Sequence, residues 1–216
     1  MLTGETKVLR AGSAPKRAAI MTAAWDLFVA DGFERTSVDA VAARAAVSKR
    51  TVYDYFGDKS TLLVAVVEAA LGALLDEIRA AVTADLLQVD DLEDALLAVT
   101  RRIAATTLGS ATYASLLGLL AAEGAHLEAV RTEWIENAPE EVIAERFAEL
   151  GRQGLLDVPD PRLAADHYVA LTFGQVLDRD QAPRGSAAED RLLVEGVRAF
   201  LRAYATAPRE DHPAGP

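Results

Sequence analysis

The chain of 216 residues contains no cysteine, which excludes disulfides, thiol catalysis and cysteine-ligated metal ions. It has only three histidines. Glu123 and His126 have the spacing of a carboxylate–histidine ligand pair in a helical di-iron bundle. Such a site requires a second pair, but Ala164 stands three residues before His167. We therefore attribute the spacing to chance and expect no metal site and no cofactor.

Enzyme motifs are missing as well. The chain has no Gly-x-Ser-x-Gly sequence and no glycine-rich loop of the kind that holds phosphate. Its serine, histidine and aspartate residues have no motif around them. We therefore predict no catalytic residues and expect that the protein is not an enzyme.

Long apolar segments are also lacking. The longest run, Leu62 to Leu75, is interrupted by Glu68 and is too short to span a bilayer. The first residues include Glu5 and Lys7 and contain no apolar signal core. The absence of cysteine fits a reducing compartment. We expect a cytoplasmic protein without a membrane partner.

Lysine is absent after Lys59, and the charge is divided unevenly along the chain. The net charge is −11. Residues 1–60 hold nine Lys or Arg against seven Asp or Glu, a net charge of +2, and the remainder holds 13 against 26, a net charge of −13. A mildly basic end on an acidic body is consistent with DNA binding at that end. An acidic body can also simply keep a protein soluble, so charge has weight only beside a motif.

The segment from Thr36 to Lys59 predicts two short helices joined by a tight turn. Thr36 and Asp39 have capping-box spacing, so we expect Thr36 to cap the first helix. Ser48 should cap a second helix that runs from Ser48 to Phe56. Gly57 should end that helix in a left-handed conformation, and the next helix should start at Asp58 and reach about Val82. This pattern predicts a helix-turn-helix with Ser48 to Phe56 as its recognition helix.

The predicted recognition helix has a polar surface suited to DNA. Val52 and Phe56 lie four residues apart and should face inward. Taken singly, the remaining side chains could be core aromatics or a solvated face. Taken together at this spacing they favour DNA, because base edges and phosphates accept bonds from cations and hydroxyls. The side chains left to line the other faces are Lys49, Arg50, Thr51, Tyr53 and Tyr55.

The run Val47 to Phe56, followed by Lys59, Leu62 and Leu63, resembles the tetracycline-repressor-like (TetR) family of transcription regulators. The preceding Leu27-Phe28, Gly32-Phe33 and Thr36-Ser37 fit the same family, and the match covers roughly Lys16 to Val67. One departure is Tyr55, where many members have histidine. The resemblance implies that Lys49, Arg50 and Thr51 contact base edges, with Tyr53 partly so. It also implies phosphate contacts from Ser37, Tyr53, Tyr55 and Lys59.

The rest of the chain repeats the helical period, and we found neither strand alternation nor internal repeats. We predict an all-α fold. Residues 1–12 should form a flexible arm, and residues 13–60 the helix-turn-helix DNA-binding domain. Residues 61–205 should form a helical domain for effector binding and dimerisation, followed by a disordered tail at 206–216.

A small-molecule pocket should lie in this helical domain. Its candidate lining is largely apolar and suggests a lipophilic or aromatic effector, although each residue could instead belong to the core. The candidates are Arg102, Tyr113, Leu117, His126, Trp134, Phe147, Tyr168 and Phe173.

The last two predicted helices, which begin at Asp160-Pro161 and at Ser186, have more apolar residues than one packing face needs. A four-helix interface with a two-fold mate would use the excess, and the family resemblance implies the same homodimer. The candidate interface residues are Leu163, Tyr168, Leu171, Leu193, Val197, Phe200, Leu201 and Tyr204.

The sequence thus favours a ligand-responsive repressor that binds a pseudo-palindromic DNA operator as a homodimer. Two alternatives stay open. One is an activator, or a regulator that needs no ligand. The other is a helical enzyme or protein-binding module without specific DNA recognition. The operator, the target genes and the effector are not given by the sequence.

Overall fold

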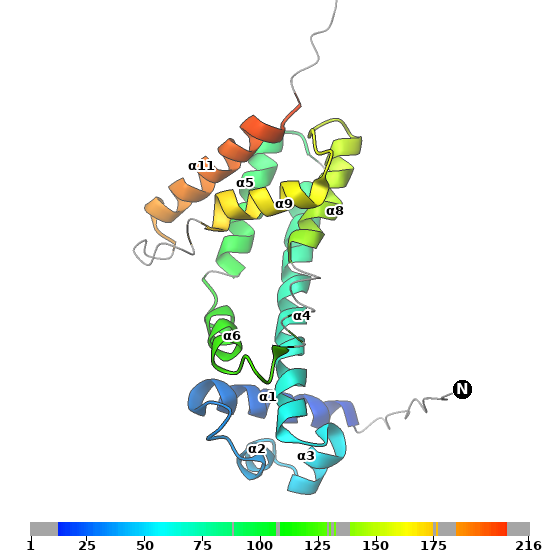
Figure 1. The fold of residues 1–216 in the computed structure, drawn as a ribbon, viewed down its shortest axis with the longest axis vertical. Helices are drawn as coiled ribbons and strands as arrows, with labels where there is room; N and C mark the ends of the chain where they lie inside the picture. Colours follow the sequence, from blue (N-terminus) through cyan, green and yellow to red (C-terminus); the bar gives the residue numbers. More distant parts are fainter. Residues whose placement is uncertain are drawn as a thin grey trace, which may run out of the picture. The chain divides into compact units, whose positions relative to one another are not determined.

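The computed structural model describes residues 13–87, 89–106, 109–128, 130, 132, 139–174, 176 and 185–206. The predicted arm at 1–12, Trp134 and all of the predicted tail except residue 206 lie outside them. The described elements are α1 (Ser13–Asp31), α2 (Val38–Arg44), α3 (Lys49–Phe56), α4 (Lys59–Leu86), α5 (Leu92–Thr106), α6 (Ala111–Ala122), α8 (Pro139–Arg152), α9 (Pro161–Val169), the π-helical turn η1 (Ala170–Gly174) and α11 (Ala187–Tyr204) (Figure 1).

The predicted all-α fold is confirmed. Within the described ranges the backbone forms one isolated antiparallel bridge, between Leu156 and Ala205, and no strand. The same part of the chain contains no single helix long and apolar enough to cross a membrane. Only α5 and α6 taken together reach that length and composition, across a bend of 66°.

The chain divides into two compact units. The first comprises Met1–Gly72 and Ala114–Trp134, and the second comprises Ala73–Tyr113 and Ile135–Pro216. The first unit is thus larger than the segment 13–60 to which we assigned DNA binding. The physical reason is burial: helices of seven and eight residues, such as α2 and α3, cannot form a core alone.

The core of the first unit draws on distant parts of the sequence. α1 buries an apolar stripe that includes Ile20 and Phe28, and the start of α4 buries Leu62 and Leu63. The α6 region adds four buried side chains to the same cluster, at Leu116, Leu119, Leu127 and Val130. These later residues complete the hydrophobic core to which α2 and α3 contribute their buried side chains.

Helix caps follow the sequence closely, with one correction. Ser48 caps α3 by accepting a bond from the N–H of Thr51 at 3.1 Å, as predicted. Asp58 accepts from the N–H of Thr61 at 2.7 Å at the start of α4. The prediction that Thr36 caps α2 is wrong, because Ser37 holds that position and accepts from the N–H of Ala40 at 3.1 Å.

Thr36 is buried instead, and its hydroxyl lies 2.8 Å from the carbonyl oxygen of Gly32 and 3.2 Å from that of Leu27. It therefore secures the chain to the end of α1. Gly57 has φ 76° and ψ −55°, so the predicted positive φ is present, although ψ is not that of a left-handed helix.

The second unit has an aromatic core. The ring of Phe147 stacks on Phe200 at a centroid distance of 5.0 Å and meets Tyr168 edge-on at 5.3 Å. The Tyr168 hydroxyl lies 2.5 Å from the hydroxyl of Thr100, which joins α9 to α5. These groups are fully or almost fully buried, so the cluster fixes α5, α8, α9 and α11 in one unit.

Close packing of α11 against η1 depends on Gly196. A Cβ atom at this position would lie 2.3 Å from the carbonyl oxygen of Leu171 and 2.9 Å from the Cα of Thr172. Any side chain would therefore push the two elements apart. The sequence did not predict this role of Gly196, because a glycine inside a helical pattern does not reveal that the backbone of another element packs against it.

Candidate nucleic-acid interface

The turn between α2 and α3 is tight and carries backbone strain. Ala46 has φ 53°, in the region that favours glycine over residues with a Cβ atom. The N–H of Val47 bonds to the carbonyl oxygen of Ala42 at 3.0 Å, and the N–H of Ala46 bonds to that of Ala43 at 3.2 Å. These bonds close the end of α2, so the short turn delivers the chain directly to Ser48 and α3.

α3 buries one face and exposes the other, as its sequence predicts. Val52 and Phe56 are buried in the core of the first unit. Lys49, Arg50 and Tyr53 are exposed, and the Arg50 side chain retains 90% of its accessible surface. The helix therefore presents two cations and a phenol on a surface that the first unit leaves open.

Thr51 and Tyr55 are less accessible than the other predicted contact residues. Both are partly buried. The Thr51 hydroxyl shares a hydrogen bond with the Ser48 hydroxyl at 2.7 Å. The ring of Tyr55 packs against the hydrophobic core, 6.3 Å from the ring of Phe56. Tyr55 thus has a packing role in addition to any role of its hydroxyl.

Each of the two cations of α3 has a carboxylate partner. The Lys49 ammonium lies 2.8 Å from an oxygen of Asp39 on α2, and this hydrogen bond raises the pKa of Lys49. The Arg50 guanidinium lies 3.9 Å from the exposed carboxylate of Asp54. Bound DNA would share these cations with the carboxylates or displace them, and this pairing was not anticipated from the sequence.

Lys59, the predicted phosphate contact at the start of α4, is partly exposed. Its ammonium nitrogen lies 2.8 Å from the carbonyl oxygen of Phe33, 3.2 Å from that of Thr36 and 3.5 Å from that of Glu34. A phosphate at this position would share the ammonium group with these carbonyls, and the contact stays a prediction. Ser37, the other phosphate candidate outside α3, is exposed at the start of α2.

The described candidates for effector binding are divided between the two units. Leu117 and His126 belong to the first unit, whereas the other described candidates belong to the second. The His126 ring lies 4.6 Å from the ring of Phe33. Arg102 is exposed and holds Asp85 through two bonds of 2.7 Å. Burial and the charge of Glu140 raise the pKa of the partly buried Tyr113.

The remaining candidates for the effector site are core residues. Phe147, Tyr168 and Phe173 are buried, and the rings of Tyr168 and Phe173 meet edge-on at 6.3 Å. Their aromatic side chains fill the second unit, which explains their apolar character without a ligand. Trp134 lies outside the described residues.

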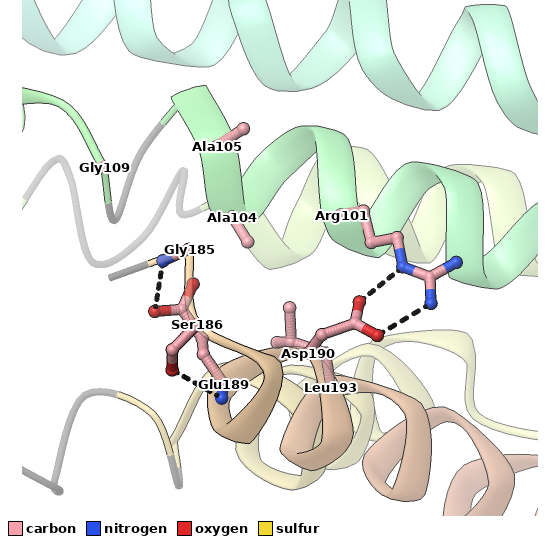
Figure 2. A pocket seen from close by; sticks show the side chains of 9 residues that line it. All are labelled: Arg101, Ala104, Ala105, Gly109, Gly185, Ser186, Glu189, Asp190 and Leu193. Atoms are coloured by element: carbon pink, nitrogen blue, oxygen red, sulfur yellow. Dashed lines mark hydrogen bonds and ion pairs between the residues drawn. The ribbon is translucent and has the colours of Figure 1, made fainter. Parts of the chain in front are cut away.

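A pocket of about 390 Å³ lies in the second unit, between the end of α5 and the start of α11 (Figure 2). Its polar groups already have partners. Arg101 holds Asp190 through bonds of 2.6 and 3.0 Å, and the Glu189 carboxylate accepts from the N–H of Gly185 at 3.3 Å. None of the predicted effector-binding residues lines it. The full lining is Arg101, Ala104, Ala105, Gly109, Gly185, Ser186, Glu189, Asp190 and Leu193.

Half of the predicted dimer interface is buried within the chain itself. Tyr168, Leu193, Val197 and Phe200 are at most 3% exposed, so in the described chain these side chains pack within it. The helices are apolar on more than one face, and composition alone does not say which face turns inward. The candidates that stay exposed or partly exposed are Leu163, Leu171, Leu201 and Tyr204.

The Glu123–His126 pair does not develop into a metal site in the part of the chain that is described. The His126 Nδ1 lies 3.6 Å from the Glu123 carboxylate. No group of three or more His, Asp or Glu side chains is placed to hold a metal ion within those residues.

Two family descriptions match the chain. Residues 20–66 match the model of bacterial regulatory proteins of the tetR family. Residues 94–206, more than half of the chain, match the C-terminal domain of AefR-like transcriptional repressors. The first match contains α2 and α3, and the second contains most of the second unit.

Two sequence relatives each match over less than a third of the chain. An HTH-type transcriptional regulator of Bacillus subtilis, YdeS, is 41% identical over 46 residues, 21% of this chain and 23% of that protein. The DNA-binding transcriptional repressor TetR of Mycobacteroides abscessus is 35% identical over 63 residues, 29% of this chain and 33% of that protein. The chain thus spans a third or less of the length of these relatives.

Solved structures match over almost the whole chain. A protein of Mesorhizobium loti assigned to the TetR family superposes with a TM-score of 0.81 at 28% identity, over 91% of this chain and 100% of that one. The flavonoid-responsive regulator FrrA superposes with a TM-score of 0.70 at 26% identity, over 90% and 98%. The two family matches and these structures agree with the helix-turn-helix geometry of α2 and α3, and the chain belongs to the TetR family of bacterial transcription regulators.

Proposed function

We propose that the protein represses transcription as a homodimer that binds a pseudo-palindromic operator and is released by a small molecule. The observation that carries this proposal is α3, which buries Val52 and Phe56 and leaves Lys49, Arg50 and Tyr53 exposed. An α-helix with such a surface fits the major groove, where guanine accepts bonds from arginine and lysine. The likeness to AefR-like repressors supports repression over activation.

We assign DNA binding to residues 13–60, and effector binding and dimerisation to residues 61–205. The residues that would contact bases are Lys49, Arg50 and Thr51, with Tyr53 partly so. Those that would contact phosphates are Ser37, Tyr53, Tyr55 and Lys59. In a two-fold dimer the two copies of α3 would enter major grooves about 34–36 Å apart. The protein would act in the cytoplasm, where its operator is.

Release by an effector requires a difference in affinity between two states of the dimer. About 5.5 kcal/mol of difference would move the population from 1:99 to 99:1. We propose a lipophilic or aromatic effector. FrrA, similar over nearly the whole chain, is described as flavonoid-responsive, which supports an aromatic compound.

Dimerisation would use the outer faces of α9 and α11. Leu163 on α9 is 47% exposed, a large fraction for a leucine. Leu201 and Tyr204 on α11 are partly exposed. Burial of these side chains against a second copy would remove apolar surface from water, and this would favour association.

The test starts with selection of duplex DNA from a random library by the wild-type protein. Fluorescence anisotropy then measures affinity for the enriched duplex and for a scrambled one at fixed salt. Arg50→Ala should reduce discrimination at one base pair by about 1–3 kcal/mol. Arg79→Ala is the control, because it removes the same charge from an exposed side chain of the second unit.

Enrichment of a two-fold symmetric sequence would support the proposal, and loss of discrimination only in the Arg50 variant would assign the surface. An enzyme or protein-binding module would enrich no duplex. A reporter gene behind the enriched sequence separates repression from activation by the sign of its response.

A further inference from the structure

Both cations of α3 are paired with carboxylates of the same surface. The Lys49 ammonium lies 2.8 Å from an oxygen of Asp39, in the first turn of α2. One turn along α3 from Arg50, an oxygen of Asp54 lies 3.9 Å from the Nε atom of the guanidinium. The four side chains keep between 49% and 90% of their accessible surface. The two pairs are therefore exposed, and together they have no net charge.

A paired cation loses net charge but keeps hydrogen-bond donors. A lysine ammonium has three N–H donors, and an arginine guanidinium has five. Asp39 accepts one bond from Lys49. Asp54 approaches the guanidinium of Arg50 at Nε rather than at its terminal nitrogens. Base edges in the major groove accept such donors, so the pairing leaves both side chains able to read a base.

A phosphate responds to the same pairs differently. Affinity for phosphates comes from neutralised charge and the release of counterions. A phosphate that contacts Lys49 or Arg50 would also lie within one Debye length, about 8 Å at physiological salt, of Asp39 or Asp54. Repulsion by the carboxylate would then offset attraction by the cation. The pairs thus weaken a contact that every DNA sequence offers and preserve one that only some base sequences offer.

We propose that Asp39 and Asp54 are specificity-determining residues, which suppress binding of α3 to DNA of any sequence and leave donors of Lys49 and Arg50 for bases. This inference rests on the proposed function, because it requires α3 to face the major groove. Exposed ion pairs contribute little to folding stability. Stability therefore does not explain why both cations of this helix have a carboxylate partner, whereas opposition to phosphate follows from their place on α3.

Asparagine substitutions test the proposal because they remove the charge and keep the shape of the side chain. Fluorescence anisotropy over a range of salt concentrations measures affinity for a scrambled duplex and for the duplex enriched by the wild-type protein. Asp39→Asn and Asp54→Asn should each bind the scrambled duplex about two- to fivefold more tightly, the size of an exposed ion-pair interaction. The salt slope should steepen by up to about 0.9 for the freed cation. Affinity for the enriched duplex should rise less, so the ratio of the two affinities should fall.

Asp76→Asn is the matched control. It removes the same charge and frees Arg79 from an exposed ion pair of 3.2 Å, but on the part of α4 that belongs to the second unit. Both affinities and both slopes should stay at their wild-type values. Equal gains for the two duplexes in the Asp39 and Asp54 variants would refute the proposal, as would an unchanged affinity for the scrambled duplex.

Titration of Lys49 tests its ion pair without DNA. The hydrogen bond to Asp39 raises the pKa of Lys49. An NMR titration of the full chain should therefore give a lower pKa for Lys49 in Asp39→Asn than in the wild type or in Asp76→Asn. An equal pKa in all three proteins would overturn the role of Asp39.

Two further results separate this proposal from the proposed function. Circular dichroism verifies that the variants are folded. If the wild-type protein enriches no duplex, the proposed function fails, but the scrambled duplex still tests the carboxylates. Tighter binding of that duplex by Asp39→Asn and Asp54→Asn, and not by Asp76→Asn, would then still show that the carboxylates suppress binding to DNA of any sequence.

Discussion

Substitutions at Tyr168 and Thr100 test whether Tyr168 acts as a core residue. Tyr168 is 1% exposed and Thr100 is fully buried. The Thr100 hydroxyl donates to the carbonyl oxygen of Leu96 at 2.5 Å, so the Tyr168 hydroxyl, also at 2.5 Å, must donate to Thr100. The only other acceptor near Tyr168 in the described contacts is the carbonyl of Leu96 at 3.4 Å.

The direction of these bonds predicts unequal effects of two substitutions. Tyr168→Phe removes a donor and leaves Thr100 bonded to Leu96, so the loss should be about 1 kcal/mol. Thr100→Val removes the acceptor and leaves the buried Tyr168 hydroxyl with one long contact, so the loss should be about 1–3 kcal/mol. The double variant should be no less stable than Thr100→Val, because no phenol then lacks a partner.

Urea unfolding at one fixed protein concentration measures these differences, since a dimer's apparent stability depends on concentration. A smaller loss for Thr100→Val than for Tyr168→Phe would refute the assigned direction of the bond. If Tyr168→Phe abolished dimerisation or effector response while stability hardly changed, the residue would belong to a binding surface after all.

Alkaline pH gives an independent measurement on the same residue. Burial raises the pKa of Tyr168 well above its ordinary value. The folded chain therefore keeps this phenol neutral, whereas the unfolded chain ionises it near pH 10. Below about pH 10 the neutral phenol of Tyr168 contributes fully to the stability of the folded chain. Above about pH 10 the free energy of unfolding should fall by about 1.4 kcal/mol per pH unit through this residue. Tyr168→Phe should lack this part of the alkaline loss.

Two further predictions concern packing and assembly. Gly196→Ala should destabilise the chain by about 1–3 kcal/mol or more in urea unfolding, because its Cβ would overlap the carbonyl of Leu171. The control Gly72→Ala has open space around its Cβ and should stabilise α4 by up to about 1 kcal/mol, so an equal effect of both would contradict the packing argument. Leu163→Glu should shift the protein toward monomer in analytical ultracentrifugation, whereas Leu117→Glu, a similarly exposed position on α6, should not. A persisting Leu163→Glu dimer would place the interface elsewhere.

The DNA-binding end could be predicted because its signals are local. Ser48, Asp58 and Gly57 act through backbone groups within a few residues of themselves, so their spacing is sufficient to place α3. The inward face of α3 follows from the same helical period. The wrong cap assignment, Thr36 in place of Ser37, arose because two adjacent hydroxyl residues satisfy the same rule, and only the fold shows that Thr36 bonds back to α1.

The second predicted domain, residues 61–205, could be predicted only as a set of helices. Phe200 and Leu201 are neighbours with the same chemistry, yet Phe200 is fully buried and Leu201 is partly exposed. A helix that is apolar on more than one face does not specify which stripe packs inside the chain. The sequence therefore led us to assign aromatic residues of this domain to the effector pocket or to the dimer interface, whereas most of the described ones are buried in the core.

The acidic composition of the chain and its membership of a DNA-binding family are reconciled at α3. Lys49 and Arg50 lie beside Asp39 and Asp54. Non-specific affinity for DNA comes mainly from neutralised phosphates, and carboxylates at the same surface reduce the number of phosphates that these cations can neutralise. If α3 reads bases as proposed, a correct base sequence would offer bidentate bonds that compete with the carboxylates, whereas a bare phosphate offers only charge. The pairing would then lower affinity for other DNA more than affinity for the operator, so that a protein with a net charge of −11 could still discriminate between sequences.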